Sequence, residues 1–341
     1  MSIEVRPLNA WDDDELASAH EALVAALRHD RPGAPVVSPD AVRVTLVRPS
    51  SHQAAHGWTA RLDERVGGTL LVTWPLVDDV EACWVLLGVA PWARRQGVGS
   101  ALHDALLRAV RLAGRSIVQV EVPHGDASQT WPGIEFARRR GYSLALREAR
   151  HVLALPLPQS RLAAEPRDGY VVHTWRDVCP ASLLDRYCRL REVFAQEAPT
   201  GDLVLAEQHW DESRVRDLEQ SRRAQRRSTW TALAMSPDGA PAGFTELVAA
   251  DDEDEAHQNQ TLVSPEHRGH GLGIALKVAN LRRLGADRPD VKRVDTTVDP
   301  DNGPMNAVNA ELGFQPVDML DEWQLDLRAG GTESTRQVIG A

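Results

Sequence analysis

A glycine-containing loop occurs twice in this chain, each time between an apolar strand-like segment and an apolar helix-like one. The copies read VAPWARRQGVG at 89–99 and VSPEHRGHGLG at 263–273, so that Gly99 and Gly273 lie 174 positions apart. Two further matches recur at an offset of 172: Gly141 with Gly313, and HVLAL at 151–155 with WQLDL at 323–327. An offset this long predicts a duplicated domain and not an array of short stacked repeats.

The boundary between the two copies is visible in the composition. The segment LPLPQSRLAAEPRDG at 155–169 carries three prolines and no strand alternation, which is typical of a linker. We therefore predict an N-terminal domain over 1–157, a linker over 158–168 and a C-terminal domain over 169–328. The polar, glycine-containing stretch 329–341 is predicted to be a disordered tail.

Both halves have the same order of predicted elements. Apolar runs predict strands that follow one another as a meander, then a strand, a helix and another strand. The clearest helices span 98–112 and 269–285, directly after the glycine loops. This order predicts an α/β (α+β) fold of two tandem domains, each with a mixed, mostly antiparallel sheet and helices on both faces.

Composition excludes several classes of function. Lys and Arg number 38 against 49 Asp and Glu, a net charge of −11, which argues against broad nucleic-acid binding. The three cysteines form no C-x-x-C motif, which favours a reducing compartment. The acidic N-terminus does not resemble a signal peptide. The longest apolar stretch, 84–93, is too short to span a bilayer. We expect a cytoplasmic monomer or homodimer without a membrane partner, and no spacing of residues indicates a metal site.

The repeated loop has the chemistry of an anion cradle. Glycines let a phosphate approach the backbone, and the first N–H groups of the following helix lack intrahelical partners. Arg94 and Arg268 either neutralise the anion or pair with a carboxylate and hold the loop. A dinucleotide-binding loop would require glycine or alanine where Leu102 and Leu276 stand, and a P-loop would require Gly-Lys-Ser/Thr. The alternative to an anion site is a tight turn without a ligand.

At these residues the chain resembles the GNAT superfamily of acetyl-coenzyme A dependent N-acetyltransferases. The tandem arrangement is similar to that of mycothiol synthase and related two-domain acetyltransferases. The resemblance covers nearly the whole chain in element order, and its sharpest residues are the two loops and NGPMNAVNAELGF at 302–314. It implies acetyl-coenzyme A as co-substrate, without a metal, and a small-molecule amine as acceptor.

The resemblance also implies which residues contact the coenzyme. They lie on both loops and beside the asparagine-rich segment, and comprise Val89, Arg94, Arg95, Gln96, Gly97, Val98, Gly99, Leu262, Val263, Arg268, Gly269, His270, Gly271, Leu272, Gly273 and Asn302. Asn302 alternatively caps its helix. In the first copy Thr130 and Ala137 stand where the second has Asn302 and Asn309, so we expect the C-terminal half to be catalytic. The N-terminal half either binds the coenzyme without turnover or only serves as a scaffold.

Glu246 is the expected general base for direct transfer. It lies in the strand-like AGFTELVA on one face with Phe244 and Val248, where apolar neighbours would raise its pKa. The alternative is an exposed surface glutamate. Glu197, His257 and Asp202 are further candidates on the acceptor side. The stretch QEAPTGD, which holds Glu197 and Asp202, is expected to cover the acceptor.

Two alternatives exist for the general acid that protonates the leaving thiolate. Related enzymes often carry a tyrosine where this chain has Asn309, so either Asn309 assists as a neutral donor or water protonates the thiolate. A backbone N–H group near Leu262 or Val263 is expected to stabilise the oxyanion. The arginines of 221–227 are expected on a salt-bridged surface helix. The alternatives to this enzyme are a mycothiol-synthase-like activity and a non-catalytic acetyl-coenzyme A sensor or scaffold.

Overall fold

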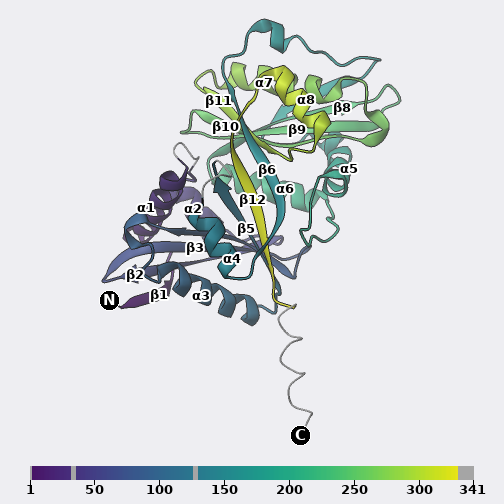
Figure 1. Cartoon of the computed structure of the whole chain (residues 1–341). Coiled ribbons are helices and arrows are strands. Elements are labelled where there is room, and N and C mark those ends of the chain that lie inside the picture. Colours follow the sequence, from purple (N-terminus) through teal and green to yellow (C-terminus); the bar gives the residue numbers. More distant parts are fainter. Residues whose placement is uncertain (1, 32–35, 126–129, 329–341) are drawn as a thin grey trace. The chain divides into compact units, whose positions relative to one another are not determined.

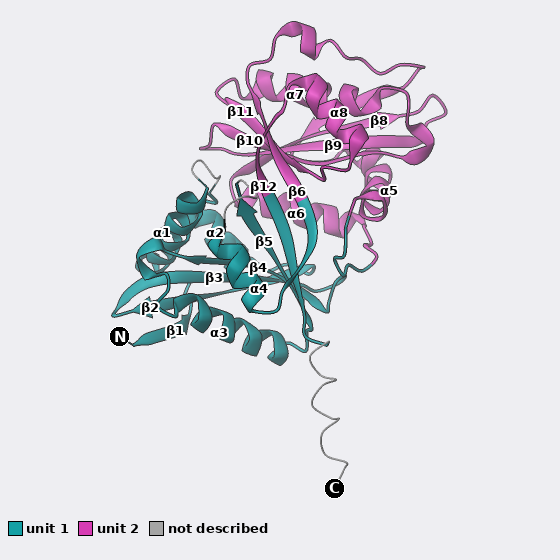
Figure 2. Cartoon of the chain, viewed as in Figure 1, with its two compact units in different colours: residues 1–147, 200–206, 320–341 teal, residues 148–199, 207–319 magenta. Residues whose placement is uncertain are grey.

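The computed structural model describes residues 2–31, 36–125 and 130–328. The chain divides into two compact units, coloured separately in Figure 2. Unit 1 comprises 1–147, 200–206 and 320–341, and unit 2 comprises 148–199 and 207–319. The predicted tail at 329–341 lies outside the described residues. In the part of the chain that is described, no helix is both long and apolar enough to cross a membrane.

Unit 1 is a sheet with helices on both faces (Figure 1). Its strands are β1 (Ile3–Pro7), β2 (Gln53–Leu62), β3 (Arg65–Pro75), β4 (Ala82–Val89) and β5 (Ile117–His124). Its helices are α1 (Asp13–Asp30), α2 (Pro39–Val47), α3 (Val98–Leu112) and α4 (Pro132–Arg139). The strands run in the order β1-β2-β3-β4-β5, antiparallel except for the parallel pair β4–β5.

Alternation along β3 assigns the helices of unit 1 to the two faces. The Thr69 hydroxyl donates a 2.7 Å hydrogen bond to the Ala19 carbonyl of α1. Its neighbour Leu70 instead packs with Leu102 and Leu106 of α3 in the main core cluster. Successive side chains of a strand point to opposite faces, so a single strand supplies both layers.

Unit 2 repeats this plan. Its strands are β7 (Val171–Arg176), β8 (Arg227–Met235), β9 (Pro241–Ala250), β10 (Glu255–Val263) and β11 (Arg293–Val298). Its helices are α5 (Ala181–Glu197), α6 (Glu212–Ala224), α7 (Leu272–Asp287) and α8 (Gly303–Leu312). The order is β7-β8-β9-β10-β11, and only β10–β11 is parallel. Phe244 packs with Tyr187 of α5, whereas Leu247 of the same strand packs with Leu281 of α7.

Two long strands are divided between the units. Strand β6 (Ser143–Ala154) begins in unit 1, and its residues 149–154 pair antiparallel with β11 in unit 2. Strand β12 (Gln315–Asp326) begins in unit 2, and its residues from 320 onward belong to unit 1, where β12 follows β5 in the strand order. Each unit is therefore completed by the final strand of the other half of the sequence.

The segment 200–206 also belongs to unit 1. Asp202 N–H donates to the Ala145 carbonyl at 2.9 Å. Gly201 has φ +52°, and a Cβ atom there would overlap the same carbonyl oxygen. Only glycine permits so close an approach between this segment and β6.

The predicted fold class is confirmed by this architecture and, as described below, by the structures that resemble it. The predicted helix at 98–112 coincides with α3, and the prediction for 269–285 coincides with α7 to within three residues. The units differ from the predicted boundaries at 157 and 169, because β6, β12 and 200–206 are exchanged. The predicted linker, 158–168, contains a 3₁₀ turn, Gln159–Leu162, that packs against α7.

Candidate active site

The parallel strands of unit 2 separate partway along their length. Glu255, Ala256 and His257 of β10 pair with β11, but β10 continues to Val263 without further pairing to β11. On its other side β10 pairs with β9 and carries a bulge between Gln258 and Thr261. A bulge bends a strand and increases its twist. The opening leaves backbone groups of β10 available to a ligand lying between the two strands.

The second glycine loop leads from β10 into α7. Gly269 and Gly271 have φ angles of +89° and +72°, a conformation that favours glycine. Gly271 is the N-cap of α7, and no side chain caps this helix end, in contrast to α8, which Asn302 caps. The first N–H groups of α7 therefore lack both intrahelical and capping partners, which is the arrangement that binds phosphate oxygens.

The first loop has the same backbone but a more crowded surface. Gly97 caps α3 with φ +90°, and Arg95 adopts φ +62° where the second loop has Gly269. At Gly99 a Cβ atom would lie 3.5 Å from the Phe136 ring, whereas at Gly273 it would lie 3.5 Å from a methyl group of Val308. An aromatic ring thus covers the first loop where a smaller aliphatic side chain covers the second.

The arginine of each loop holds the loop in place. Arg94 Nε donates to the Val89 carbonyl at 3.0 Å, and its guanidinium lies 2.7 Å from Asp30 at the end of α1. Arg268 Nε donates to the Val263 carbonyl at 3.2 Å and pairs at 2.7 Å with Glu197 at the end of α5. Of the two roles that the sequence left open, carboxylate pairing is the one found in both units.

The second loop carries two histidines that the first lacks. His267 Nδ1 lies 3.0 Å from the Tyr170 hydroxyl, and His270 Nδ1 lies 2.6 Å from Asp168. Ala93 and Gln96 occupy the corresponding positions in the first copy. The Gln96 side chain instead donates to the Trp92 carbonyl at 2.8 Å.

A cavity of about 510 Å³ adjoins the N-terminus of α7. It is lined by the linker together with Gly271, Ile274 and Glu311. The linker contributes Arg161 and Arg167, both exposed, and neither has a carboxylate partner among the described residues. Arg161 donates to the Leu312 carbonyl at 3.2 Å and lies against Gly313, where a Cβ atom would overlap it. Two arginines beside uncapped helix N–H groups match a ligand with several phosphates.

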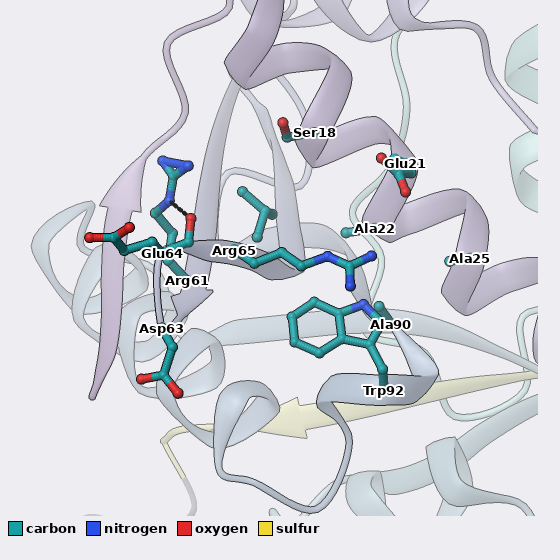
Figure 3. A pocket seen from close by; sticks show the side chains of 11 residues that line it. Ser18, Glu21, Ala22, Ala25, Arg61, Asp63, Glu64, Arg65, Ala90 and Trp92 are labelled. Atoms are coloured by element: carbon teal, nitrogen blue, oxygen red, sulfur yellow. Dashed lines mark hydrogen bonds between the residues drawn. The ribbon is translucent and has the colours of Figure 1, made fainter. Parts of the chain in front are cut away.

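Unit 1 contains a different cavity, of about 420 Å³, between α1 and the turn from β2 to β3 (Figure 3). The Arg65 guanidinium lies over the Trp92 ring, 4.4 Å from its centre. Its lining mixes Arg61 and Arg65 with Glu21, Asp63 and Glu64, and contains none of the residues 94–99. Three acidic residues face two arginines in this cavity, and it includes Ala90 and Trp92 of the first loop but not the glycine-containing part that precedes α3.

Glu246 lies at the centre of a buried ionic cluster on the α5–α6 face of unit 2. Its carboxylate accepts hydrogen bonds from the Tyr187 hydroxyl at 2.5 Å, Arg191 at 3.0 Å, Arg222 at 3.1 Å and Asn259 at 3.1 Å. Only 1% of Glu246 is exposed. Arg191 also lies over the Trp210 ring at 3.9 Å.

This cluster bears on two sequence predictions. Burial alone would raise the pKa of Glu246, but Arg222 and Arg191 together lower it to about 2, so the expected raised pKa is wrong. The sequence predicts a salt-bridged surface helix for the arginines of 221–227, and Arg222 does form a salt bridge, but with the buried Glu246. No local pattern indicated Tyr187 or Arg191, because these residues reach Glu246 from a helix more than fifty positions away.

The other predicted residues are dispersed. Asp202 belongs to unit 1, and its place on the acceptor side stays a prediction. Glu197 is paired with Arg268. His257 Nδ1 lies 3.1 Å from its cross-strand neighbour Asp295, at the last pair before β10 and β11 separate. Asn302 accepts from the Met305 N–H at 3.2 Å and caps α8.

Asn309 is buried between α8 and α7, and the residue that contacts it was missed in the sequence. Lys277 Nζ donates to Asn309 Oδ1 at 2.7 Å. Lys277 is 2% exposed, and burial lowers its pKa to about 7. A lysine inside the apolar run 272–279 was the available signal. It was overlooked because α7 buries more than one face, against the sheet, α8 and the linker.

All three cysteine thiols are free and buried. Burial raises the pKa of Cys83 and Cys179 to about 12 and that of Cys188 to about 11. Within the described ranges no group of three or more His, Cys, Asp or Glu residues could hold a metal ion.

Comparison with known proteins agrees with this geometry. A family model described as the acetyltransferase (GNAT) family matches residues 21–142 and 189–314, one region in each half. A mycothiol acetyltransferase of Acidothermus cellulolyticus is 29% identical over 273 residues, covering 75% of this chain and 74% of that protein.

Solved structures share the fold. A tandem GNAT protein from the clavulanic acid biosynthesis pathway is 28% identical with a TM-score of 0.80, covering 96% of this chain and 99% of that one. A GCN5-related N-acetyltransferase from Sphaerobacter thermophilus, 15% identical with a TM-score of 0.68, covers 95% and 96%. The second similarity concerns the fold alone.

Proposed function

The chain belongs to the acetyltransferase (GNAT) family, and from this premise we propose that its C-terminal unit transfers the acetyl group of acetyl-coenzyme A directly to the primary amine of a small molecule. The observation that carries the proposal is the open, uncapped N-terminus of α7 beside the separation of β10 from β11. In unit 1 the N-terminus of α3 is also uncapped and β4 pairs with β5 only as far as Val85, so these two features are common to both units. The cavity with Arg161 and Arg167 adjoins the N-terminus of α7 in unit 2.

Three differences favour unit 2 over unit 1 as the site of catalysis. The first loop is covered by Phe136 where the second is covered by Val308. Strand β4 pairs with β3 in a continuous register from Gly68 to Thr73, whereas β10 carries a bulge. The cavity in unit 1 contains none of the residues 94–99, whereas the cavity in unit 2 contains Gly271. We assign to unit 1 the role of a scaffold that completes the fold through the exchanged strands.

The coenzyme would be held by groups of this chain with distinct tasks. The N–H groups of residues 271–273 and the guanidinium groups of Arg161 and Arg167 would bind its phosphates. Arg268 positions the loop through Val263 and Glu197. When bound, acetyl-coenzyme A supplies an activated acetyl thioester. A backbone N–H of β10 near Leu262 or Val263 would stabilise the oxyanion.

Direct transfer follows from the state of the possible nucleophiles. Each thiol is buried with a raised pKa, so no cysteine is available as a thiolate to carry the acetyl group at neutral pH. Glu246, with its pKa near 2 and four hydrogen-bond donors, is too weak a base to take a proton from an ammonium group. We propose instead that Glu246 anchors Tyr187, Arg191 and Arg222 below the acceptor, and that water takes the proton.

His257 is the candidate that we retain on the acceptor side. Its side chain is 47% exposed and lies at the point where β10 and β11 separate, with Asp295 orienting the ring. Glu197 contributes indirectly by holding Arg268. The acidic balance of the chain, with a net charge of −11, favours a cationic acceptor.

The proposal is tested by thiol release. Purified protein is mixed with acetyl-coenzyme A and a panel comprising an amino sugar, a polyamine, amino acids and a peptide with a free N-terminus, and free thiol is followed with a chromogenic reagent. We expect one molecule of acetyl-coenzyme A to bind per chain. We also expect at least one amine of the panel to cause thiol release. Binding without release for every amine would favour a non-catalytic sensor, and absence of binding would refute the proposal.

A second candidate acceptor comes from the similarity to the mycothiol acetyltransferase. A mycothiol-synthase-like enzyme would acetylate a cysteinyl pseudo-disaccharide, which is also an amine. Including a cysteinyl amino sugar in the panel distinguishes this activity from a broader one. Because that acceptor carries its own thiol, its acetylation is followed by mass spectrometry, and acetylation of that acceptor alone would select the narrower function.

A further inference from the structure

The cavity of unit 1 has a floor of small apolar residues. Ala22, Val66 and Ala90 form a buried cluster of their own, and Ala25 packs against it. All four line the cavity of about 420 Å³ between α1 and the turn from β2 to β3 (Figure 3). Protein interiors are close-packed, and alanines at three of these positions leave a space that larger side chains would fill. A volume of this size is typical of pockets that hold a small molecule.

One wall of this cavity is a stacked pair of side chains. Arg65 Cζ lies 4.4 Å from the centre of the Trp92 ring, and Figure 3 shows the guanidinium extending between this ring and α1. The ring is held in place, because a Cβ atom at Gly67 would lie 3.4 Å from its edge and the Gln96 side chain donates to the Trp92 carbonyl. A guanidinium stacked on a fixed ring presents a planar set of donors that suits two-point binding of a carboxylate.

Charged groups of both signs line the cavity without pairing with one another. In the described part of the chain, the contact with Trp92 is the one side-chain interaction found for Arg65. Within the same ranges, no ion pair is found for Glu21 of α1 or for Asp63 of the turn. All three side chains are exposed. One guanidinium and two carboxylates are therefore available to a ligand.

The signs of these charges restrict the class of ligand. A purely anionic ligand on Arg65 would meet the carboxylates of Glu21 and Asp63, and a purely cationic ligand would add positive charge beside Arg65. Like charges brought together oppose binding, whereas complementary charges favour it. A small zwitterion satisfies both signs, and the alanine floor offers apolar surface to its remaining atoms. The chemistry is that of a free α-amino acid.

The duplicated half provides an internal comparison. Counted from the strand pairs that precede the two glycine loops, Arg65 and Trp92 of unit 1 correspond to Ala240 and Glu266 of unit 2. Unit 2 therefore has neither the guanidinium nor the aromatic ring at this place. The cavity of unit 1 also contains none of the residues 94–99. The stacked pair is thus a feature of unit 1 and not of the glycine loop that the two units share.

We propose that the cavity of unit 1 binds a free α-amino acid, with its carboxylate on Arg65, its ammonium on Glu21 and its side chain over the alanine floor. Three acidic residues and two arginines line the cavity, so a basic side chain is preferred to an acidic one. This inference goes beyond the proposed function, in which unit 1 is a scaffold, and makes unit 1 a ligand-binding module as well.

The test measures binding of amino acids to the full chain in the absence of coenzyme. Calorimetry compares lysine with glutamate, with 1,5-diaminopentane, which lacks the carboxylate, and with Nα-acetyl-lysine, which lacks the α-ammonium. Lysine should bind about tenfold more tightly than each of the other three, because only lysine satisfies both signs of charge without adding an acid. The indole N–H resonance of Trp92, assigned by its loss in Trp92→Phe, should shift as lysine is added.

Variants place the ligand in the cavity. Arg65→Gln and Glu21→Gln should each weaken lysine binding about tenfold, since each removes a charge-assisted contact. Ala25→Leu should weaken it by filling the floor. Arg138→Gln is the matched control, because Arg138 is an exposed arginine of the same unit that lies over the Trp323 ring, at 5.6 Å, outside this cavity. It should leave lysine binding unaltered.

The outcomes separate this site from the acceptor site and from a role in folding. If no amino acid binds, or if lysine binds without moving the Trp92 resonance and equally well to Arg65→Gln, the inference is refuted. Weakening by Arg138→Gln as large as that by Arg65→Gln would refute it too. A lower Tm with unchanged lysine binding in Arg65→Gln and Ala25→Leu would make the stacked pair purely structural. Thiol release by Arg65→Gln should equal that of the wild type, so a failure of the proposed function is read separately.

Discussion

The Tyr187 hydroxyl donates a 2.5 Å hydrogen bond to Glu246, joining a helix of unit 2 to a central strand of its sheet. Arg191 and Arg222 also pair with this carboxylate, so one buried negative charge offsets part of the positive charge of two buried guanidinium groups. Removing one partner of such a group leaves uncompensated charge in the core.

We therefore expect Glu246→Gln to destabilise the fold. The loss should be about 3–5 kcal/mol of the free energy of unfolding, because Arg191 and Arg222 would remain buried without a counter-charge. Urea unfolding measures it. Glu4→Gln, which breaks an exposed pair with Arg6, should have little effect on the free energy of unfolding, because solvent screens that pair. Equal effects of the two changes would contradict the assignment of Glu246 as an anchor.

The same residue predicts a pH dependence. The pKa of Glu246 falls from 4.5 to about 2 on folding, so its stabilising contribution is complete above pH 4.5 and is lost as pH falls toward 2. The difference in unfolding free energy between wild type and Glu246→Gln should therefore shrink between pH 5 and pH 2, by on the order of 3 kcal/mol. A difference that is constant over this range would show that Glu246 titrates normally.

Gly271→Ala should separate coenzyme binding from folding. An alanine at φ +72° costs about 1–2 kcal/mol, and Gly97→Ala in the first loop, at φ +90°, should cost as much. Only Gly271→Ala is expected to weaken acetyl-coenzyme A binding, by about tenfold or more, measured by calorimetry. Equal weakening by Gly97→Ala would place a functional coenzyme site in unit 1 as well.

Arg161 and Arg167 should contribute phosphate binding that depends on salt. Replacing both with Gln is expected to weaken coenzyme A binding about tenfold at low ionic strength and less at high ionic strength, because exposed charges are screened. Arg282→Gln is a suitable control, since that arginine lies on α7 but pairs with Glu165. If the control weakens binding as much as the double variant, the linker arginines have no special role.

The buried thiols should be unreactive in the folded protein. With pKa values raised to about 11 and 12, Cys83, Cys179 and Cys188 should react with a thiol reagent at pH 8 only after unfolding in guanidinium. The count should rise from none to three. A thiol that reacts rapidly in the native state would reopen a mechanism through an acetyl-cysteine.

The sequence was sufficient for features that are local or that repeat. The left-handed glycines of the loops, the helices that follow them and the alternation that places Phe244 and Glu246 on one face were all predictable. These features depend on backbone conformation and on the period of apolar residues, which neighbouring residues specify. The duplication itself was visible because both copies retain glycines at matching positions.

The tertiary structure alone decided which distant side chains meet. Glu246 was predicted to have a raised pKa because its strand neighbours are apolar, but helices α5 and α6 bring Arg191 and Arg222 to it. Lys277 resembles a surface lysine in the sequence until α8 and the linker enclose its helix. The charge state of a buried group is set by everything packed around it, and those neighbours come from positions that no local pattern connects.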